Sequence, residues 1–134
     1  MATLQRYLDR RVLITGGGSG IGQASVLRIL DEGGRVVAAD ISEAGLADTV
    51  AKAGKHADRL STVVMDVASE PSVQQGVAAA VGVLGGLDTL VNVAGILRSA
   101  HFLDTTLAEF EHVLRVNLIG TFLVTREALP ALRR

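Results

Sequence analysis

The sequence contains the stretch Val12-Leu13-Ile14-Thr15-Gly16-Gly17-Gly18-Ser19-Gly20-Ile21-Gly22, from which the rest of the chain can be interpreted. The apolar run at 12–15 predicts a short buried strand. Five glycines then fall within seven residues, and glycine adopts backbone angles that other residues avoid. From Ile21 onward apolar residues recur at helical spacing, which predicts a helix with one apolar face. A strand, a glycine turn and a helix place the free N–H groups of a helix N-terminus where a phosphate can bind.

The spacing of these glycines distinguishes the turn from two other phosphate-binding loops. No three of them fit Gly-x-Gly-x-x-Gly, and the Gly-Lys-Ser/Thr of a P-loop is missing. The spacing does fit Thr-Gly-x-x-x-Gly-x-Gly, at Thr15, Gly16, Gly20 and Gly22. Gly16 would turn the chain off the strand, Gly20 would let a ligand approach the backbone, and Gly22 would let helix and sheet pack closely. A tight strand–helix turn without any ligand is the alternative interpretation.

This turn resembles that of the short-chain dehydrogenase/reductase family, whose members use it to hold NAD(H) or NADP(H). The resemblance implies an oxidoreductase that transfers hydride between nicotinamide and a small alcohol or ketone, and that forms homo-oligomers (dimers or tetramers). Within the turn, it implies cofactor contacts by Thr15, Gly16, Ser19, Gly20, Ile21 and Gly22.

Composition limits the other function classes. Of the 134 residues, 49% are hydrophobic, 3% are aromatic and 15 are glycine, which suits parallel strands covered on both faces by closely packed helices. The formal net charge is −1, so neither nucleic-acid nor anionic-membrane binding is indicated. The sequence has no cysteine, and its three histidines lack ligand spacing, so we expect no metal. A signal peptide and a membrane-spanning run are both missing from it, and we expect a soluble, cytoplasmic protein.

Predicted strands and helices alternate along the chain at intervals of about 25 residues. The strands are predicted at 12–15, 35–40, 60–67 and 87–93, and the helices at 21–30, 43–54, 73–84 and 106–132. Such alternation implies an α/β fold with a doubly wound parallel sheet. In the Rossmann order 3-2-1-4, the first two helices cover one face, the last two cover the other, and ligands bind at the carboxyl ends of the strands. We expect one NAD(P)-binding domain over 1–134, incomplete at its C-terminus because it stops before a fifth strand.

Asp40 closes the second predicted strand, 18 residues after Gly22. In a dinucleotide-binding fold an acid here accepts hydrogen bonds from the adenosine ribose hydroxyls. It also repels a 2′-phosphate, by about 4 kcal/mol for one like-charge pair at ~4 Å and an effective dielectric of ~20. No lysine or arginine stands at Ser19, Ile41 or Ser42 to reverse this repulsion, so the sequence predicts NAD in preference to NADP. A helix-capping or solvated aspartate is the alternative.

Two further strand ends resemble the family. Asp66-Val67 ends the third predicted strand, where the family's aspartate hydrogen-bonds the adenine amino group and the next residue packs on the ring. A turn-forming aspartate is the alternative there. The segment 92–95 resembles the family's Asn-Asn-Ala-Gly and departs from it only at Val93. The cofactor contacts that these matches imply are those of Asp66, Val67, Asn92, Ala94 and Gly95.

Asn117 lies within the last predicted helix, three residues before Gly120. Asparagine competes for backbone hydrogen bonds and glycine adds backbone entropy, so the helix should be weakened there. In the family, an asparagine in this setting marks a bent helix whose freed carbonyl holds a water of the proton relay. The resemblance therefore implies a catalytic role for Asn117, and an ordinary polar-face asparagine is the alternative.

The family's catalytic serine and Tyr-x-x-x-Lys pair have no counterpart in this sequence. The only tyrosine, Tyr7, precedes the first strand, and no tyrosine lies near Lys52 or Lys55. We therefore expect a truncated chain, the N-terminal half of such an enzyme, which binds NAD but is inactive alone. Two alternatives stay open: a non-catalytic module that senses NAD or regulates a partner, and a site completed by a second copy or chain.

Overall fold

The structure is a computed structural model that describes residues 4–134. In these residues four parallel strands form one sheet in the order β3-β2-β1-β4, as the sequence predicts. The strands are β1 (Arg11–Thr15), β2 (Arg35–Asp40), β3 (Leu60–Val64) and β4 (Thr89–Asn92). The helices are α1 (Gly20–Asp31), α2 (Glu43–Ala53), α3 (Glu70–Leu84), α4 (Leu107–Leu114) and α5 (Gly120–Leu132). Shorter helical segments are η1 (Gly54–Arg59), η2 (Phe102–Asp104) and η3 (Arg115–Ile119).

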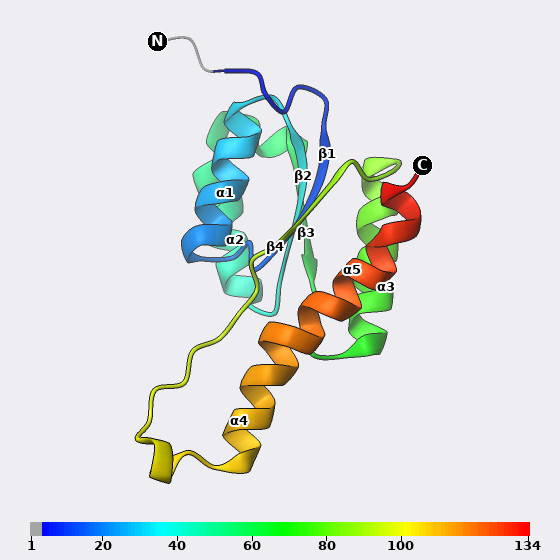
Figure 1. Cartoon of the computed structure of the whole chain (residues 1–134). Helices are drawn as coiled ribbons and strands as arrows, with labels where there is room; N and C mark the ends of the chain where they lie inside the picture. Colours follow the sequence, from blue (N-terminus) through cyan, green and yellow to red (C-terminus); the bar gives the residue numbers. More distant parts are fainter. Residues whose placement is uncertain (1–3) are drawn as a thin grey trace.

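The sheet lies between two helical layers, with α1 and α2 on one face and α3 and α5 on the other (Figure 1). Side chains alternate across a strand, so Val12 and Ile14 of β1 belong to the core under α1 and α2, whereas Leu13 belongs to the core under α3 and α5. Burial of both faces provides the main stabilising term for such a fold. It leaves the carboxyl ends of the strands available for a site.

Two strands are shorter than predicted, because a strand extends only as far as its neighbour. β3 ends at Val64, which pairs with Asp40 at the end of β2, and not at Val67. β4 covers 89–92, opposite 12–15 of β1, and not the predicted 87–93. The residues that follow Val64 of β3 and Asn92 of β4 therefore lie in irregular segments at the carboxyl edge of the sheet.

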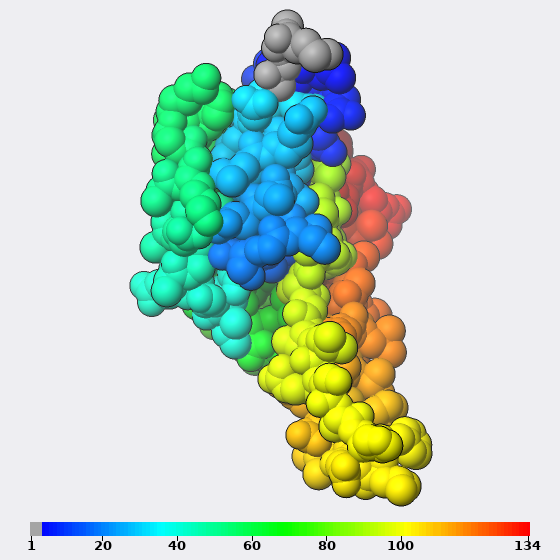
Figure 2. All heavy atoms as spheres, turned by 90° about the vertical axis from the view of Figure 1, so that its left-hand side faces the viewer, coloured from blue at the N-terminus to red at the C-terminus, as the bar shows by residue number. Residues whose placement is uncertain are grey.

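The helix predicted over 106–132 is interrupted at η3, which has the wider turn of a π-helix. α4 before it buries none of its residues, whereas α5 after it packs Leu123, Val124 and Ala128 into the core. α4 and the loop before it therefore project from the body, as the yellow and orange residues of Figure 2 show. Within residues 4–134, no helix combines the length and the apolar character needed to cross a membrane.

A buried carboxylate joins the N-terminal segment to the end of α1. Glu32 is fully buried and accepts hydrogen bonds from Arg6, at 2.5 and 2.6 Å, and from Arg28, at 2.5 Å. The hydrogen bond from Arg6, aided by that from Arg28 and opposed by burial, lowers the pKa of Glu32 to about 2. The backbone N–H of Tyr7 also donates to the Glu32 carbonyl, at 3.1 Å. These contacts hold Tyr7 beside the C-terminal end of α1, at the end of the sheet opposite the carboxyl ends of the strands.

Candidate functional site

A cleft of about 540 Å³ opens where the segments that follow the strands meet the start of α1. This is the usual place for a ligand in an open α/β sheet. The predicted cofactor residues that line the cleft are Gly16, Ser19, Gly20, Ile21, Gly22, Asp40, Asp66, Val67, Ala94 and Gly95. Three predicted site residues lie outside the lining, namely Thr15, Asn92 and Asn117.

The glycines of the turn differ in the space around them. Gly16 has φ +71°, and a Cβ there would come within 2.7 Å of the backbone nitrogen of Ala94. A Cβ on Gly22 would collide with the carbonyl oxygen of Gly16, so α1 and the turn pack too closely for any side chain. Gly20 has φ +51°, yet a Cβ there would meet nothing within 4 Å. Gly16 and Gly22 therefore allow close packing, whereas Gly20 borders open space in the cleft.

The N-terminus of α1 has no side-chain cap. Ser19 occupies the N-cap position, but its hydroxyl makes no capping hydrogen bond. By contrast, α2, α3 and α4 are capped by Ser42, Ser69 and Thr106. The first N–H groups of a helix have no intrahelical partner, so those of α1 are available at the cleft together with the positive end of the helix dipole. Such a helix start can bind an anion.

Thr15 and Asn92 act behind the cleft rather than in it. Thr15 is buried, and its hydroxyl accepts hydrogen bonds from the backbone N–H groups of Val93 and Ala94, both at 3.2 Å. Asn92 donates to the hydroxyl of Thr125 on α5, at 3.1 Å. Both residues therefore hold the segment after β4 in place beside the glycine turn.

The Asp40 carboxylate is fixed by two backbone donors. The N–H of Gly18 donates to one oxygen and the N–H of Ser42 to the other, each at 2.9 Å. A carboxylate has further lone pairs, so it can still accept from a ligand hydroxyl. Arg98 is the one lysine or arginine of the described chain that lines the cleft, and it belongs to the loop after β4. The Asp40 side chain thus stabilises the glycine turn and also lines the cleft.

Asp66 and Val67 follow β3. The Asp66 carboxylate accepts a hydrogen bond from the N–H of Ala68 at 2.9 Å. The backbone N–H of Asp66 donates to the Ser72 hydroxyl, also at 2.9 Å, so Asp66 forms a turn. Val67 is buried, and α5 begins directly against it, because a Cβ on Gly120 would lie 2.8 Å from a Val67 methyl group. The turn holds Asp66 at the wall of the cleft.

Asn117 lies in η3, where the sequence predicts a weakened helix. Its side chain does not reach the cleft lining but bonds to Ile96, which does line it. Its backbone carbonyl accepts from the hydroxyl of Thr121 at 3.1 Å. Asn117 therefore fixes one wall of the cleft from behind.

The cleft also includes residues that the sequence does not single out. His112 of α4 and Val116 of η3 both line it, and their spacing of four residues puts them on one helix face. Their position in the helical segment directly before Asn117 was the available signal. The remaining residues that line the cleft are Ala39, Ile41, Met65, Val93, Ile96 and Arg98.

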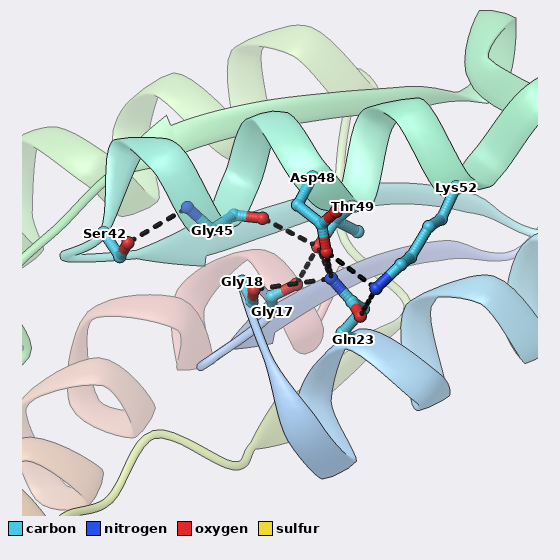
Figure 3. A network of polar contacts seen from close by, with 8 residues as sticks. All are labelled: Gly17, Gly18, Gln23, Ser42, Gly45, Asp48, Thr49 and Lys52. Carbon is cyan, nitrogen blue, oxygen red and sulfur yellow. Dashed lines mark hydrogen bonds and ion pairs between the residues drawn. The ribbon is translucent and has the colours of Figure 1, made fainter.

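A polar network joins the glycine turn to α2 (Figure 3). The fully buried Thr49 donates its hydroxyl to the carbonyl oxygen of Gly17 at 2.8 Å. The side-chain amide of Gln23 donates to Thr49 and to Asp48, both at 2.9 Å, and lies 3.4 Å from the carbonyl oxygen of Gly18. The hydrogen bond from Lys52, followed by that from Gln23, lowers the pKa of Asp48, so this carboxylate is charged at neutral pH.

Relatives of known name match most of this chain. Levodione reductase of Leifsonia aquatica is 38% identical over 132 residues, which cover 96% of this chain and 49% of that protein. The 3-oxoacyl-[acyl-carrier-protein] reductase FabG of Thermotoga maritima is 36% identical over 118 residues, which cover 88% of this chain and 48% of that protein. The chain thus spans about half the length of these relatives.

Solved structures are also similar to most of this chain, which spans about half of each of them. A short chain dehydrogenase from Mycobacterium smegmatis superimposes with a TM-score of 0.89 at 34% identity, over 99% of this chain and 55% of that one. The 3-ketoacyl-(acyl-carrier-protein) reductase from Brucella melitensis, solved in complex with NADH, gives a TM-score of 0.84 at 30% identity, over 92% and 50%. The sequence model of the family described as short chain dehydrogenase matches residues 10–134. With its Rossmann-type sheet and its glycine turn, this chain belongs to the short-chain dehydrogenase family of oxidoreductases.

Proposed function

We infer that this chain binds NAD in the cleft, as the cofactor-binding part of an enzyme that transfers hydride between nicotinamide and an alcohol or carbonyl group. The observation that carries this inference is the open space at Gly20 beside the uncapped start of α1. These features offer N–H donors and room for an anion, and Asp40 adds an acceptor in the same cleft. The residues present therefore fit a diphosphate flanked by a ribose.

We assign NAD rather than NADP because Asp40 has no cationic neighbour on the strand end or in the glycine turn. Ile41, the next residue, is apolar and 67% exposed, so nothing there would pair with a 2′-phosphate. A fixed carboxylate within about 4 Å would repel that group by several kcal/mol before screening. The NADH complex of the Brucella melitensis relative supports a nicotinamide cofactor in general.

When bound, the nicotinamide ring donates or accepts the hydride. This chain's residues would hold the cofactor and shape the cleft, with Asn117 and Thr15 fixing the segment after β4 from behind. A proton must also move to or from the substrate oxygen. Tyr7, the only tyrosine in the sequence, does not line the cleft, and its backbone N–H donates to the Glu32 carbonyl. We therefore propose that residues outside these 134 supply the acid/base group, and that this chain binds NAD without turnover.

The names of the relatives, which include a levodione reductase and an L-fucose dehydrogenase, support a small carbonyl or alcohol substrate for the whole protein. Self-association is supported by large apolar side chains that α4, η3 and α5 leave exposed. They are Leu107, Phe110, Leu114, Leu118, Phe122 and Leu129. We propose that the whole protein is a homo-oligomer through this surface.

A second candidate is a non-catalytic module that binds NAD to sense it or to regulate a partner, which the position of Tyr7 away from the cleft also supports. Calorimetric titration of the chain with NAD and NADP tests the binding that both candidates share, and failure to bind NAD would overturn it. Reading the coding sequence beyond codon 134 for a serine and Tyr-x-x-x-Lys separates the two. NADH oxidation with a panel of ketones by the 134 residues alone would contradict the proposed lack of turnover.

A further inference from the structure

We propose that Thr49 and Gln23 are positioning residues for the cofactor, because they hold the glycine turn in the conformation that binds the diphosphate. The proposal rests on the binding of NAD inferred above and adds α2 to the site. Thr49 lies on α2 and Gln23 on α1, so the turn is held by side chains from both helices (Figure 3).

The N–H groups of Gly17 and Gly18 and the carbonyl of Gly17 are held by hydrogen bonds from neighbouring elements. The N–H of Gly17 donates to the Ala39 carbonyl at 3.0 Å, and that of Gly18 donates to Asp40 at 2.9 Å. The carbonyl of Gly17 accepts from Thr49 and that of Gly18 lies near the Gln23 amide. Gly16 and Gly20, on either side, line the cleft. One half of the turn is thus tied to β2 and α2, while the other half faces the ligand.

This fixation matters because consecutive glycine peptides rotate easily. A rotated Gly17–Gly18 peptide would turn its carbonyl oxygen, with its partial negative charge, towards Asp40, and would change the path of the turn that leads to the N–H donors of α1. Thr49 binds the Gly17 oxygen on the side of α2, away from the anion, and Gln23 donates to the Thr49 hydroxyl. A site held in its binding conformation before the ligand arrives loses less entropy on binding. The network should therefore strengthen diphosphate binding without contacting the ligand.

Thr49 is the stronger member of the pair. It is fully buried, so removal of its hydroxyl leaves the buried Gly17 carbonyl without its short hydrogen bond from α2. Gln23 is partly exposed, and its contact with Gly18 is longer, at 3.4 Å. Asp48 and Lys52 hold Gln23 from the surface, where such contacts contribute little.

The test compares Thr49→Val, which removes the hydroxyl at constant shape, with Thr49→Ser, which keeps it. Thr62→Val on the exposed side of β3 is the matched control. Affinities are measured by calorimetry for NAD and by NMR titration for adenosine, which lacks the diphosphate. We expect Thr49→Val to weaken NAD binding about tenfold. Adenosine affinity should stay unchanged, Thr49→Ser should restore NAD binding, and Thr62→Val should match the wild type.

Amide exchange in the ligand-free chain is the second readout. The N–H groups of Gly17 and Gly18 should exchange faster in Thr49→Val and at the wild-type rate in Thr62→Val. Equal losses for NAD and adenosine, or unchanged exchange at the turn, would overturn the proposal. If Thr49→Val does not fold, Gln23→Met takes its place, with a loss of about threefold for NAD expected. Unchanged NAD binding in that variant would also overturn it. A wild-type chain that binds no NAD refutes the proposed function instead.

Discussion

The side chain of Asn117 makes two hydrogen bonds to the backbone of Ile96. Its Oδ1 accepts from the Ile96 N–H, and its Nδ2 donates to the Ile96 carbonyl, both at 2.8 Å. The side-chain amide thereby replaces a neighbouring strand for a residue that lies beyond the end of β4. It also joins the π-turn of η3 to the wall of the cleft. The contact requires a side-chain amide, which offers one donor and one acceptor side by side.

Asn117→Asp should therefore loosen this wall. The variant loses the donor to the Ile96 carbonyl and brings a negative charge against it, which should destabilise the chain by about 1–3 kcal/mol. We expect faster amide exchange at Ile96 and weaker NAD binding. Exchange measured by NMR at Ile96 and at Val37, in the buried centre of the sheet, separates local opening from global unfolding. Equal acceleration at both positions would contradict a local role.

The double variant Asp40→Ser with Ile41→Arg should change the preference of the chain from NAD towards NADP. It removes a repelling carboxylate and adds a guanidinium, which pairs well with phosphate. We expect the ratio of NAD affinity to NADP affinity to fall by about 100-fold, since each factor of ten corresponds to about 1.4 kcal/mol. Because Asp40 also accepts from Gly18 and Ser42, total affinity should fall as well. An unchanged ratio would refute the assignment of Asp40 to the ribose.

Gly20→Asn tests the open space over the turn, and the chain provides a matched control. Gly85, at the end of α3, also has a positive φ and nothing within 4 Å of a built Cβ, but it lies outside the cleft. Asparagine tolerates positive φ better than other side chains, so both variants should fold, each with a small loss of stability. Only Gly20→Asn should lose NAD affinity, by at least about tenfold. Similar NAD binding by the two variants would favour a tight turn without a ligand.

The ion pairs of Glu32 should make stability depend on acid pH. Its pKa is about 2 in the folded protein against an ordinary 4.5, so the charged form stabilises the fold. That contribution is complete above about pH 4.5 and disappears as the pH falls towards 2. Glu32→Gln should be less stable at pH 7, and its stability should fall less steeply across this range. Urea unfolding at several pH values measures both, and Glu111→Gln, an exposed glutamate of α4, should follow the wild type.

The fold could be predicted from the sequence because each strand contains an apolar run, and in the helices apolar residues recur at helical spacing. Strand ends were less predictable, since Val64 ends β3 only because β2 ends at Asp40. The position of the residues that follow the strands could be predicted, because the carboxyl ends of parallel strands meet at one edge of the sheet, where the cleft lies. Thr49 and Gln23 were missed, since a polar residue within a helix carries no sign of what lies opposite it. Thr15 and Asn92 fit the family motif, but the hydrogen bonds that they make behind the cleft could not be inferred from that motif.

The missing cap of α1 has a consequence for the thermodynamics of the whole chain. A side-chain cap is typically worth about 1 kcal/mol, and α1 begins without one while α2, α3 and α4 each have theirs. An anion at the same N–H groups would supply the missing interaction, and any ligand that binds only the native state raises the melting temperature with its concentration. The cofactor would then complete the secondary structure as well as the site. Selection for tight binding would oppose selection for stability at this one helix end, because a hydroxyl that capped α1 would compete with the ligand for the same donors.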